Sequence, residues 1–313
     1  MFDVITFGSG TKDVFFEMKE GFAVDERNNI CFPLGSKMDI TKMELASGGG
    51  GTNVAVGLSK QGLFVSYCGK IGDDGAGYQI IKELKENKVD TRFVSISKEK
   101  PTNYSVVLSV PNKDRSIFVY RGASGDHNSS DFPMRRLNAR WFYLAPFSLK
   151  KKDLFYALID YAELKSIKLM VNPSKAQLKE EKIKSYLSKI SVLLLNKEEA
   201  SILTEVSIKN EDELFKKIKE ISSNLVIITN GEKDVVAVYK DNLYKVSAKK
   251  VEAVCKTGAG DAFGSGFLSE LIRSGDVEKS LHFGIENAAS CVLKMGAKNG
   301  LLKGTGSASL TKK

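Results

Sequence analysis

The sequence predicts a three-layer α/β fold, in which a mostly parallel sheet is covered by helices on both faces and a small β-sheet stands apart. Two patterns carry this prediction. From Trp141 onward, apolar runs of strand length alternate with helical segments, which is typical of a parallel sheet. Earlier in the chain, short strand patterns joined by polar turns indicate a β excursion inserted into the α/β core.

The composition is typical of a globular protein that is neither secreted nor embedded in a membrane. Of its 313 residues, 42% are hydrophobic and 27% are charged, and no run of about 18 apolar residues occurs. The opening Met1–Ile5 enters a strand pattern directly, without the regions of a signal peptide. Four dispersed cysteines and only two histidines argue against a zinc site and favour reduced thiols. We therefore expect a cytoplasmic protein with no membrane partner.

The net charge of +9 raises the alternative of a nucleic-acid-binding protein. The basic residues are spread over helical patterns such as Leu178–Lys189 and Leu214–Ser222, where lysine and glutamate interleave. A solvated surface explains this distribution as well as a basic patch does, and the same field would attract a small anionic substrate. We expect no nucleic-acid partner.

The chain opens with a strand pattern at Val4–Gly8 that runs into Ser9 and Gly10. Neither a third glycine nor a helical pattern follows, so a dinucleotide-binding motif is not indicated. The β excursion comes next, in two parts. Its expected strands are Val14–Glu17, Ile30–Phe32, Ile40–Leu45, Asn103–Val110 and Ser116–Tyr120, with the hairpin turn of the last two at Pro111–Asp114.

The elements of the α/β core follow from apolar runs and from helical periodicity. Strands are expected at Val65–Lys70, Trp141–Leu144, Leu169–Asn172, Val192–Leu195, Leu225–Thr229 and Val235–Tyr239. Helices are expected at Val54–Gln61, Ala76–Asn87, Lys152–Lys165, Leu178–Lys189, Glu198–Thr204, Glu211–Ser222 and from Asp261 to about Arg273.

A run of four glycines, Gly48–Gly51, directly precedes the first expected helix. Glycine loses the most conformational freedom on folding, so such a run indicates that something approaches the backbone closely. The alternative is a flexible hinge, but a hinge is seldom followed at once by a well-formed helix. We favour a ligand-binding loop.

The stretch Gly258-Ala259-Gly260-Asp261 carries the clearest chemistry. Its glycines let successive amides turn toward a ligand at the start of a helix, where the helix dipole favours an anion such as phosphate. Asp261 would repel a phosphate there unless it accepts the proton of a hydroxyl that attacks the phosphorus. The alternative is a glycine turn followed by a helix cap.

These stretches and two further motifs resemble the ribokinase-like PfkB family of sugar and nucleoside kinases, from Gly8 to about Gly300. The matching segments are Gly48–Ala55, Asn196–Glu199, Thr229–Lys233 and Gly258–Phe263. Several spaced motifs in the correct order make a chance match remote. The resemblance implies a ribokinase-like core, a single kinase domain over residues 1–313, and a β-sheet lid formed by residues 14–46 and 101–121. It also implies that the lid closes over the sugar and provides a surface for a homodimer.

The resemblance implies roles for individual residues. Asp261 would be the catalytic base, beside an anion hole formed by Gly258, Ala259 and Gly260. The residues that would hold acceptor hydroxyls are Asp13, Gly48, Gly49 and Asn53. The residues that would border the ATP nucleotide are Thr229, Gly231 and Lys233. Mg²⁺ and its waters would be ordered by Asn196 and Glu199, whose side chains carry the hard oxygen donors that suit this ion. Because no Gly-x-x-x-x-Gly-Lys-[Ser/Thr] motif occurs, phosphate binding must depend on the glycine anion hole and not on a P-loop.

Several candidate residues also have a local interpretation. Asp13 could be a turn former, and Asn196 could cap the following helix, with Glu199 completing a local hydrogen bond. Arg121 lies where a returning lid strand could reach an acceptor phosphate, yet it could equally be a solvated arginine. Asn287 could flank an adenine pocket, although its small neighbours also suit helix packing.

The sequence departs from the family pattern before the anion hole. Many members have Asp-Thr-Thr or Asp-Thr where Cys255-Lys256-Thr257 stands here. In relatives with a monovalent-cation site the first Asp is a ligand, and a neutral thiol is a poor partner for K⁺. We therefore expect weak K⁺ dependence. The Lys256 ammonium would lie either near the triphosphate or in solvent.

The sequence thus predicts an ATP-dependent, Mg²⁺-dependent kinase that phosphorylates a hydroxyl of a sugar. One alternative is a nucleoside kinase of the same fold, since lid aromatics could stack on a base. Those aromatics are Phe15, Phe16, Phe32 and Tyr104. Another alternative is a non-catalytic sugar or nucleotide sensor, but a sensor has no need for a base at Asp261.

Overall fold

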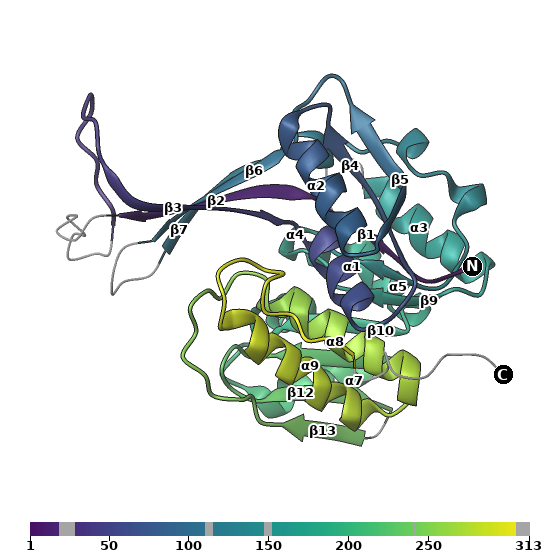
Figure 1. Ribbon diagram of the computed structural model, residues 1–313. Helices are drawn as coiled ribbons and strands as arrows, with labels where there is room; N and C mark the ends of the chain where they lie inside the picture. Colours follow the sequence, from purple (N-terminus) through teal and green to yellow (C-terminus); the bar gives the residue numbers. More distant parts are fainter. Residues whose placement is uncertain (19–28, 110–114, 147–151, 241, 305–313) are drawn as a thin grey trace.

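The computed structural model describes residues 1–18, 29–109, 115–146, 152–240 and 242–304, which form a large sheet between two helical layers and a smaller sheet (Figure 1). The strands of the large sheet are β1 Phe2–Phe7, β4 Val65–Gly72, β5 Asp90–Ser97, β8 Ala139–Leu144, β9 Lys168–Val171, β10 Val192–Asn196, β11 Leu225–Thr229, β12 Val235–Tyr239 and β13 Asn242–Val246. Their order is β13-β12-β11-β10-β9-β8-β1-β4-β5. All pairs are parallel except β11–β12 and β12–β13. The predicted mostly parallel sheet is confirmed.

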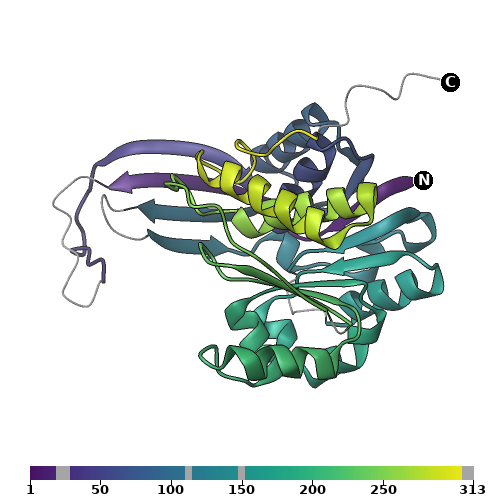
Figure 2. The ribbon, with the colours of Figure 1, turned by 90° about the horizontal axis from the view of Figure 1, so that it is seen from below.

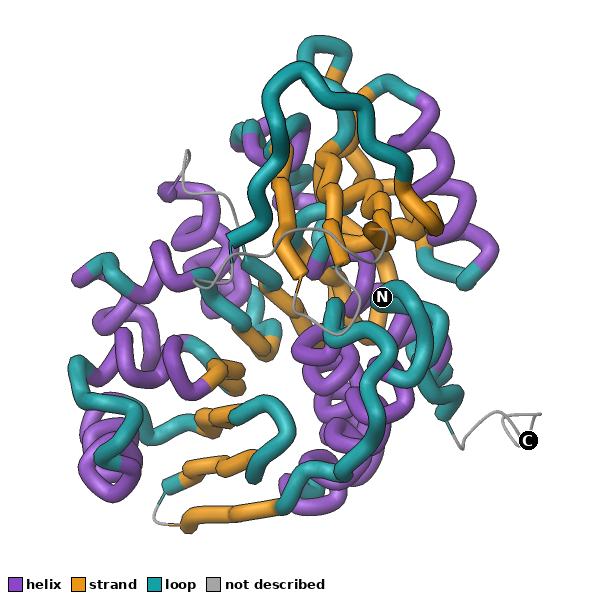
Figure 3. The backbone as a smooth tube through the Cα atoms, turned by 90° about the vertical axis from the view of Figure 1, so that its left-hand side faces the viewer, coloured by secondary structure: helices purple, strands orange, loops and turns teal. Residues whose placement is uncertain are grey.

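Helices cover both faces of this sheet, as Figure 3 shows from the side of the small sheet. One layer contains α1 Gly50–Lys60, α2 Gly75–Glu86, α8 Ala259–Ser274 and α9 Val277–Val292. The other contains α3 Lys152–Leu164, α5 Glu181–Tyr186, α6 Lys197–Thr204 and α7 Glu211–Ile221, with the short α4 Lys175–Leu178. Alternate residues of β10 enter the two cores: Leu193 packs toward α3 and α7, and Leu194 packs toward α1 and α8. A sheet buried on both faces explains why its strands read as continuous apolar runs.

The small sheet consists of β2 Thr11–Met18, β3 Ile40–Gly48, β6 Asn103–Ser109 and β7 Arg115–Tyr120, in the order β3-β2-β6-β7. It projects from the α/β body in Figures 1 and 2, and we call it the lid. Its residues alternate between two faces. Phe15 and Val107 pack with Cys255, so their face, which also carries Asp13, is directed toward the C-terminal part of the core.

Several boundaries differ from the predictions. Helix α1 begins at Gly50, inside the glycine run and not after it, because Gly49 takes a φ of 94° and caps the helix. The expected strand Ile30–Phe32 is wrong: only an isolated bridge forms at Ile30, since β2 is already paired on both sides by β3 and β6. The expected helix Leu178–Lys189 is broken into α4, α5 and a final 3₁₀ turn. The predicted turn Pro111–Asp114 lies outside the described residues.

Candidate active site

The glycine-rich loop places the first carboxylate at the base of the lid. Gly49, with its positive φ, turns the chain from β3 into α1. A Cβ at Gly48 would collide with the carboxylate of Asp13 on the neighbouring strand β2. The absence of a side chain at Gly48 therefore lets the loop lie directly against Asp13. The two residues were both expected to hold the acceptor, which requires them to lie close together.

The second carboxylate meets the same loop from helix α8. Asn53 Nδ2 donates a hydrogen bond of 2.8 Å to Asp261 Oδ2. The other carboxylate oxygen, Asp261 Oδ1, lies 3.4 Å from where a Cβ at Gly50 would stand. Asn53 Oδ1 is buried and has no hydrogen-bond partner among the described residues. A buried acceptor without a donor is costly, so this atom is well suited to receive a ligand hydroxyl.

The predicted anion hole is the first turn of α8. Gly258 caps the helix with a φ of 82°, and a Cβ there would collide with Ala297. A Cβ at Gly260 would meet no atom within 4 Å. The first amides of a helix have no partner within it, and here they begin a helix of 16 residues. Two consecutive residues of α8 therefore face different parts of the site. Gly260 borders an open pocket, whereas Asp261 contacts Asn53.

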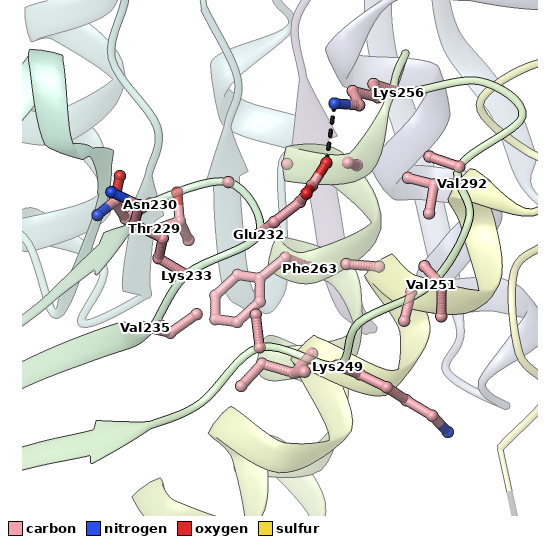
Figure 4. A pocket seen from close by; sticks show the side chains of 18 residues that line it. Thr229, Asn230, Glu232, Lys233, Val235, Lys249, Val251, Lys256, Phe263 and Val292 are labelled. Atoms are coloured by element: carbon pink, nitrogen blue, oxygen red, sulfur yellow. Dashed lines mark ion pairs between the residues drawn. The ribbon is translucent and has the colours of Figure 1, made fainter.

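That pocket is a cavity of about 420 Å³ between α8, α9 and the segments that follow β11 and β13 (Figure 4). Its polar wall contains the predicted nucleotide residues Thr229, Gly231 and Lys233, and its floor includes Phe263. The remaining wall is mostly aliphatic, contributed by Val235, Val251, Ile285, Ala288, Ala289 and Val292. An apolar slot that ends at helix amides suits a planar base with a phosphate chain.

Two exposed side chains meet at the rim of this pocket. Lys256 Nζ lies 2.8 Å from Glu232 Oε1, as the dashed line in Figure 4 marks. Exposed pairs of this kind contribute at most about 1 kcal/mol, so the bridge can open easily. Lys256 lines the pocket and its side chain is also exposed to solvent, so both positions expected for its ammonium stay open.

Asn196 and Glu199 form a reciprocal cap at the start of α6. Asn196 Oδ1 accepts from the Glu199 amide, and Glu199 Oε2 accepts from the Asn196 amide, both at 2.8 Å. This is the local interpretation of the two residues. Asn196 also pairs in register with Thr229 of the pocket wall, so the cap stands at the pocket edge. The cap uses Glu199 Oε2, and carboxylate oxygens such as those of Glu199 are hard donors that suit a hydrated Mg²⁺.

Burial dominates the electrostatics of the two acceptor-site carboxylates. It raises the pKa of Asp13 to about 6, although a hydrogen bond with Ser105 opposes the shift and the charge of Asp261 adds to it. Burial also raises the pKa of Asp261, against the hydrogen bond from Asn53. A carboxylate with a raised pKa is a stronger base than an ordinary aspartate, which suits proton abstraction near neutral pH.

Two further predicted residues have other surroundings. Arg121 is exposed, forms no hydrogen bond or ion pair within the described chain, and lines a small hollow with Gly8 and Ser9, next to the glycine loop, whose Thr52 amide donates to the Ser9 carbonyl. Asn287 does not line the pocket. It is fully buried between α8 and α9, where its amide donates to the Ala262 carbonyl and accepts from the Leu302 amide. The structure therefore replaces the expected adenine contact of Asn287 with a packing role.

Three residues near the site were not predicted. Thr257 Oγ1 and the Tyr143 hydroxyl are buried without partners among the described residues, and both lie beside the start of α8. Lys298 is only 4% exposed, and its charge acts on both Asp13 and Asp261. Thr257 has a sequence signal in its place before Gly258. The other two have none, because only the packing of distant elements brings them here.

The described residues contain neither a membrane-spanning helix nor a cluster of metal-binding side chains. No helix in that part of the chain is long and apolar enough to cross a membrane. No group of three or more His, Cys, Asp or Glu side chains there is arranged to hold a metal ion.

The relatives of the chain include sugar kinases. The ribokinase of Haemophilus influenzae is 25% identical over 264 residues, covering 82% of this chain and 85% of the relative. The probable chloroplastic fructokinase-6 of Arabidopsis thaliana is 28% identical over 251 residues, covering 75% and 65% of the two chains.

Solved structures share the fold. The ribokinase of Cryptococcus neoformans in complex with ADP superposes with a TM-score of 0.77 at 21% identity, over 97% of both chains. The adenosine kinase of Sinorhizobium meliloti gives a TM-score of 0.78 at 20% identity, over 95% of both.

The pattern of the pfkB family carbohydrate kinases matches residues 22–303, which is most of the chain. The matched range includes Asn53 and Asp261, which meet at the start of α8, and the residues that line the pocket beside it. This chain is therefore an enzyme of the pfkB family of carbohydrate kinases.

Proposed function

We propose that this enzyme transfers the γ-phosphoryl group of ATP to a hydroxyl of a sugar, with Asp261 as the catalytic base. The observation that supports this most directly is the contact between Asn53 and Asp261 at the amino end of α8. There a carboxylate with a raised pKa, an acceptor atom without a partner among the described residues and the first amides of a 16-residue helix lie together. A sensor of sugars or nucleotides would need the last two but not the first.

In this mechanism the acceptor alcohol binds between the two carboxylates, with hydroxyls donating to Asp13 and to Asn53 Oδ1. Asp261 accepts the proton of the reacting hydroxyl as its oxygen bonds to the γ-phosphorus and the bond to the ADP oxygen breaks. The amides of Gly258, Ala259 and Gly260 stabilise the charge on the transferred group. Mg²⁺, held through water by Asn196 and Glu199, would neutralise charge on the phosphate chain.

The arrangement of the lid favours a sugar over a nucleoside. Register pairing puts Phe15 on the lid face that carries Asp13, whereas Phe16 and Tyr104 occupy the opposite face. Phe32 is exposed and outside the strands. Of the four candidate aromatics, only Phe15 is therefore directed toward the acceptor, where it packs with Val107. A single packed ring is a limited platform for a base.

We further propose a single kinase domain over residues 1–313 whose lid comprises about 14–46 and 101–121, acting in the cytoplasm. Thr229, Gly231 and Lys233 would contact ATP. Arg121 would reach an acceptor only if the lid closes. Weak K⁺ dependence follows from the thiol at Cys255, which is buried against the lid. The exposed lid face would form a homodimer.

The experiment that tests the mechanism is Asp261→Asn, which preserves the size of the side chain and removes the base. We expect acceptor binding by calorimetry to be retained and kcat to fall by about 10²–10⁴-fold. Near-normal turnover would contradict the assignment. Asp212→Asn is the matched control, because Asp212 is also a first-turn aspartate of a helix but is exposed on α7.

The acceptor is identified by a screen with ATP. Ribose and fructose represent the sugars, and adenosine, inosine and cytidine represent the nucleosides. We expect turnover with a sugar. Turnover with nucleosides alone would instead establish the alternative function of the same site.

A further inference from the structure

Lys298 belongs to a short loop that touches both halves of the proposed site. The loop Gly296–Asn299 follows α9 and lies beneath the base of the lid in Figure 1. Ala297 fills the space that a side chain at Gly258 would need, and a Cβ at Gly296 would stand 3.2 Å from Ala46 of β3. The loop therefore supports the anion hole on one side and the lid on the other.

The Lys298 side chain ties this loop to two other elements. Its Nζ donates to Ser47 Oγ over 2.6 Å and lies 3.3 Å from Glu83 Oε2 of α2. Ser47 also donates a hydrogen bond to Glu83, which closes a three-membered cluster. The Lys298 carbonyl accepts from Lys60 Nζ of α1 over 2.7 Å. Hydrogen bonds thus hold both the side-chain ammonium and the backbone carbonyl of Lys298 in place.

The cluster is linked directly to the acceptor loop. Ser47 immediately precedes Gly48, the residue against which Asp13 packs. A displacement of Ser47 would therefore move the loop that carries Gly48 and Gly49 relative to Asp13. Errors of about 1 Å in the placement of reacting groups are known to cost large factors in rate.

A second argument comes from charge. Asp13 and Asp261 are both largely surrounded by protein, and each would be easier to ionise with a cation nearby. The charged and titratable groups around them are Lys12, Lys60, Glu83, Tyr143, Cys255, Cys291 and Lys298. Burial raises the pKa of Tyr143 and of Cys291, so both are neutral at pH 7. Among the described residues, Lys298 is the cation whose charge lowers the pKa of both carboxylates.

We propose that Lys298 is a positioning residue for the phosphoryl acceptor: its buried ammonium holds the lid base and the anion-hole loop together and balances the charge of the two aspartates. Removing a buried ammonium from water is costly unless it is paired, and Glu83 provides the pair. The inference rests on the proposed function, because it takes Asp13 and Asp261 as the groups that meet the acceptor.

The test compares Lys298→Met with Lys298→Arg, which retains the charge, and with Lys294→Met, an exposed lysine of the same segment. For Lys298→Met we expect the KM of the acceptor to rise about tenfold while the KM of ATP changes little. Without the cation the carboxylates are protonated at higher pH, so the acidic limb of kcat/KM should move upward by about one unit. Lys298→Arg should return the acidic limb of kcat/KM to its wild-type pH, and Lys294→Met should have the same pH profile and KM values as the wild type.

A merely structural lysine would give a different result. Both KM values and the acidic limb of Lys298→Met would then match the wild type, with kcat reduced only by the fraction of unfolded protein measured by circular dichroism. That outcome would overturn the inference. Glu83→Asp provides a second variant, which keeps a carboxylate for the ammonium but shortens the side chain by one methylene and so disturbs the cluster with Ser47 and Lys298. It should raise the acceptor KM without moving the limb upward, and an unchanged KM would remove the positioning argument. A failure of the proposed function would look different, since the wild type itself would then phosphorylate no acceptor.

Discussion

At the scale of single residues, two carboxylates share one site and both resist ionisation. Asp13 is 5% exposed, and the charge of Asp261 adds to the effect of burial on its pKa. Both aspartates must nevertheless be charged in the proposed mechanism, one to accept hydrogen bonds from the alcohol and one to accept its proton. The site is therefore most active in a pH range above that of ordinary aspartates.

The pH dependence follows from this argument. Because the folded-state pKa of Asp13 is about 6, up from 3.8, the ionised form is lost as pH falls through about 6. We expect kcat/KM for the acceptor, which reports groups of the free enzyme, to decline below about pH 6. An acidic limb of kcat/KM near pH 4 would contradict the raised pKa values of the two aspartates. In the Asp13→Asn variant, kcat/KM should be much lower, and its remaining acidic limb should reflect the ionisation of Asp261 alone.

The sequence predicted the residues of this site to different degrees. Asp261 and Asn53 stand near glycines in recognisable motifs, Asp13 was implied by the family resemblance, and the structure brings all three to the base of the lid. Lys298 carries no such pattern among 47 lysines and arginines. Its burial depends on Glu83, which lies 215 positions away. A contact between residues so far apart in the sequence produces no local sequence pattern from which the burial of Lys298 could be predicted.

At the scale of elements, the start of α8 separates two roles of glycine. Gly258 is left-handed and packed against Ala297, whereas Gly260 borders open space on the pocket side. The first is required by the fold, because other residues in this conformation are strained and a Cβ has no room. The second is required only by whatever enters the pocket.

Alanine substitutions separate the two roles. Gly258→Ala should lower the free energy of unfolding by about 2 kcal/mol or more, from left-handed strain and overpacking. Gly260→Ala should leave that stability unchanged or slightly higher, since alanine favours helix. It should instead raise the KM of ATP, because its methyl group enters the pocket. Chemical denaturation and steady-state kinetics measure both effects, and a destabilised Gly260→Ala with a normal KM would refute this division.

Other elements show where sequence patterns were weaker. The apolar strands β10 and β11 were predicted within a residue, because burial on both faces demands continuous apolar runs. The strands β5 and β13 at the two edges of the sheet were not expected, since most of their residues remain partly or fully exposed. The bounds of helix α9 were also not predicted, although Asp276 provides a cap signal by accepting from the Lys279 amide.

At the scale of the whole molecule, one face of the lid is exposed over part of its length, whereas toward the tip Leu108 of the same face is buried and packs with Ile30. Register pairs Leu45 with Val14, Val14 with Val106 and Val106 with Phe118, so these four side chains lie across one face. Leu45 is 56% exposed and Phe118 is 59% exposed. The opposite face, with Asp13 and Phe15, is directed at the active site. A contiguous apolar patch on a protruding sheet is typical of an interface.

We expect this face to pair with the same face of a second copy, which would bury the patch and hold the lid at a fixed angle to the core. Phe118→Glu should then convert a dimer into a monomer in sedimentation velocity, because an unpaired charge is excluded from an apolar contact. Leu243→Glu is the control, since Leu243 is similarly apolar and 44% exposed but lies on β13, at the far edge of the large sheet. A wild-type protein that sediments as a monomer at micromolar concentration would exclude the pairing. If dimerisation also orders the lid, the Phe118→Glu monomer should show a raised KM for the acceptor and an unchanged KM for ATP, because only the acceptor site includes a lid carboxylate.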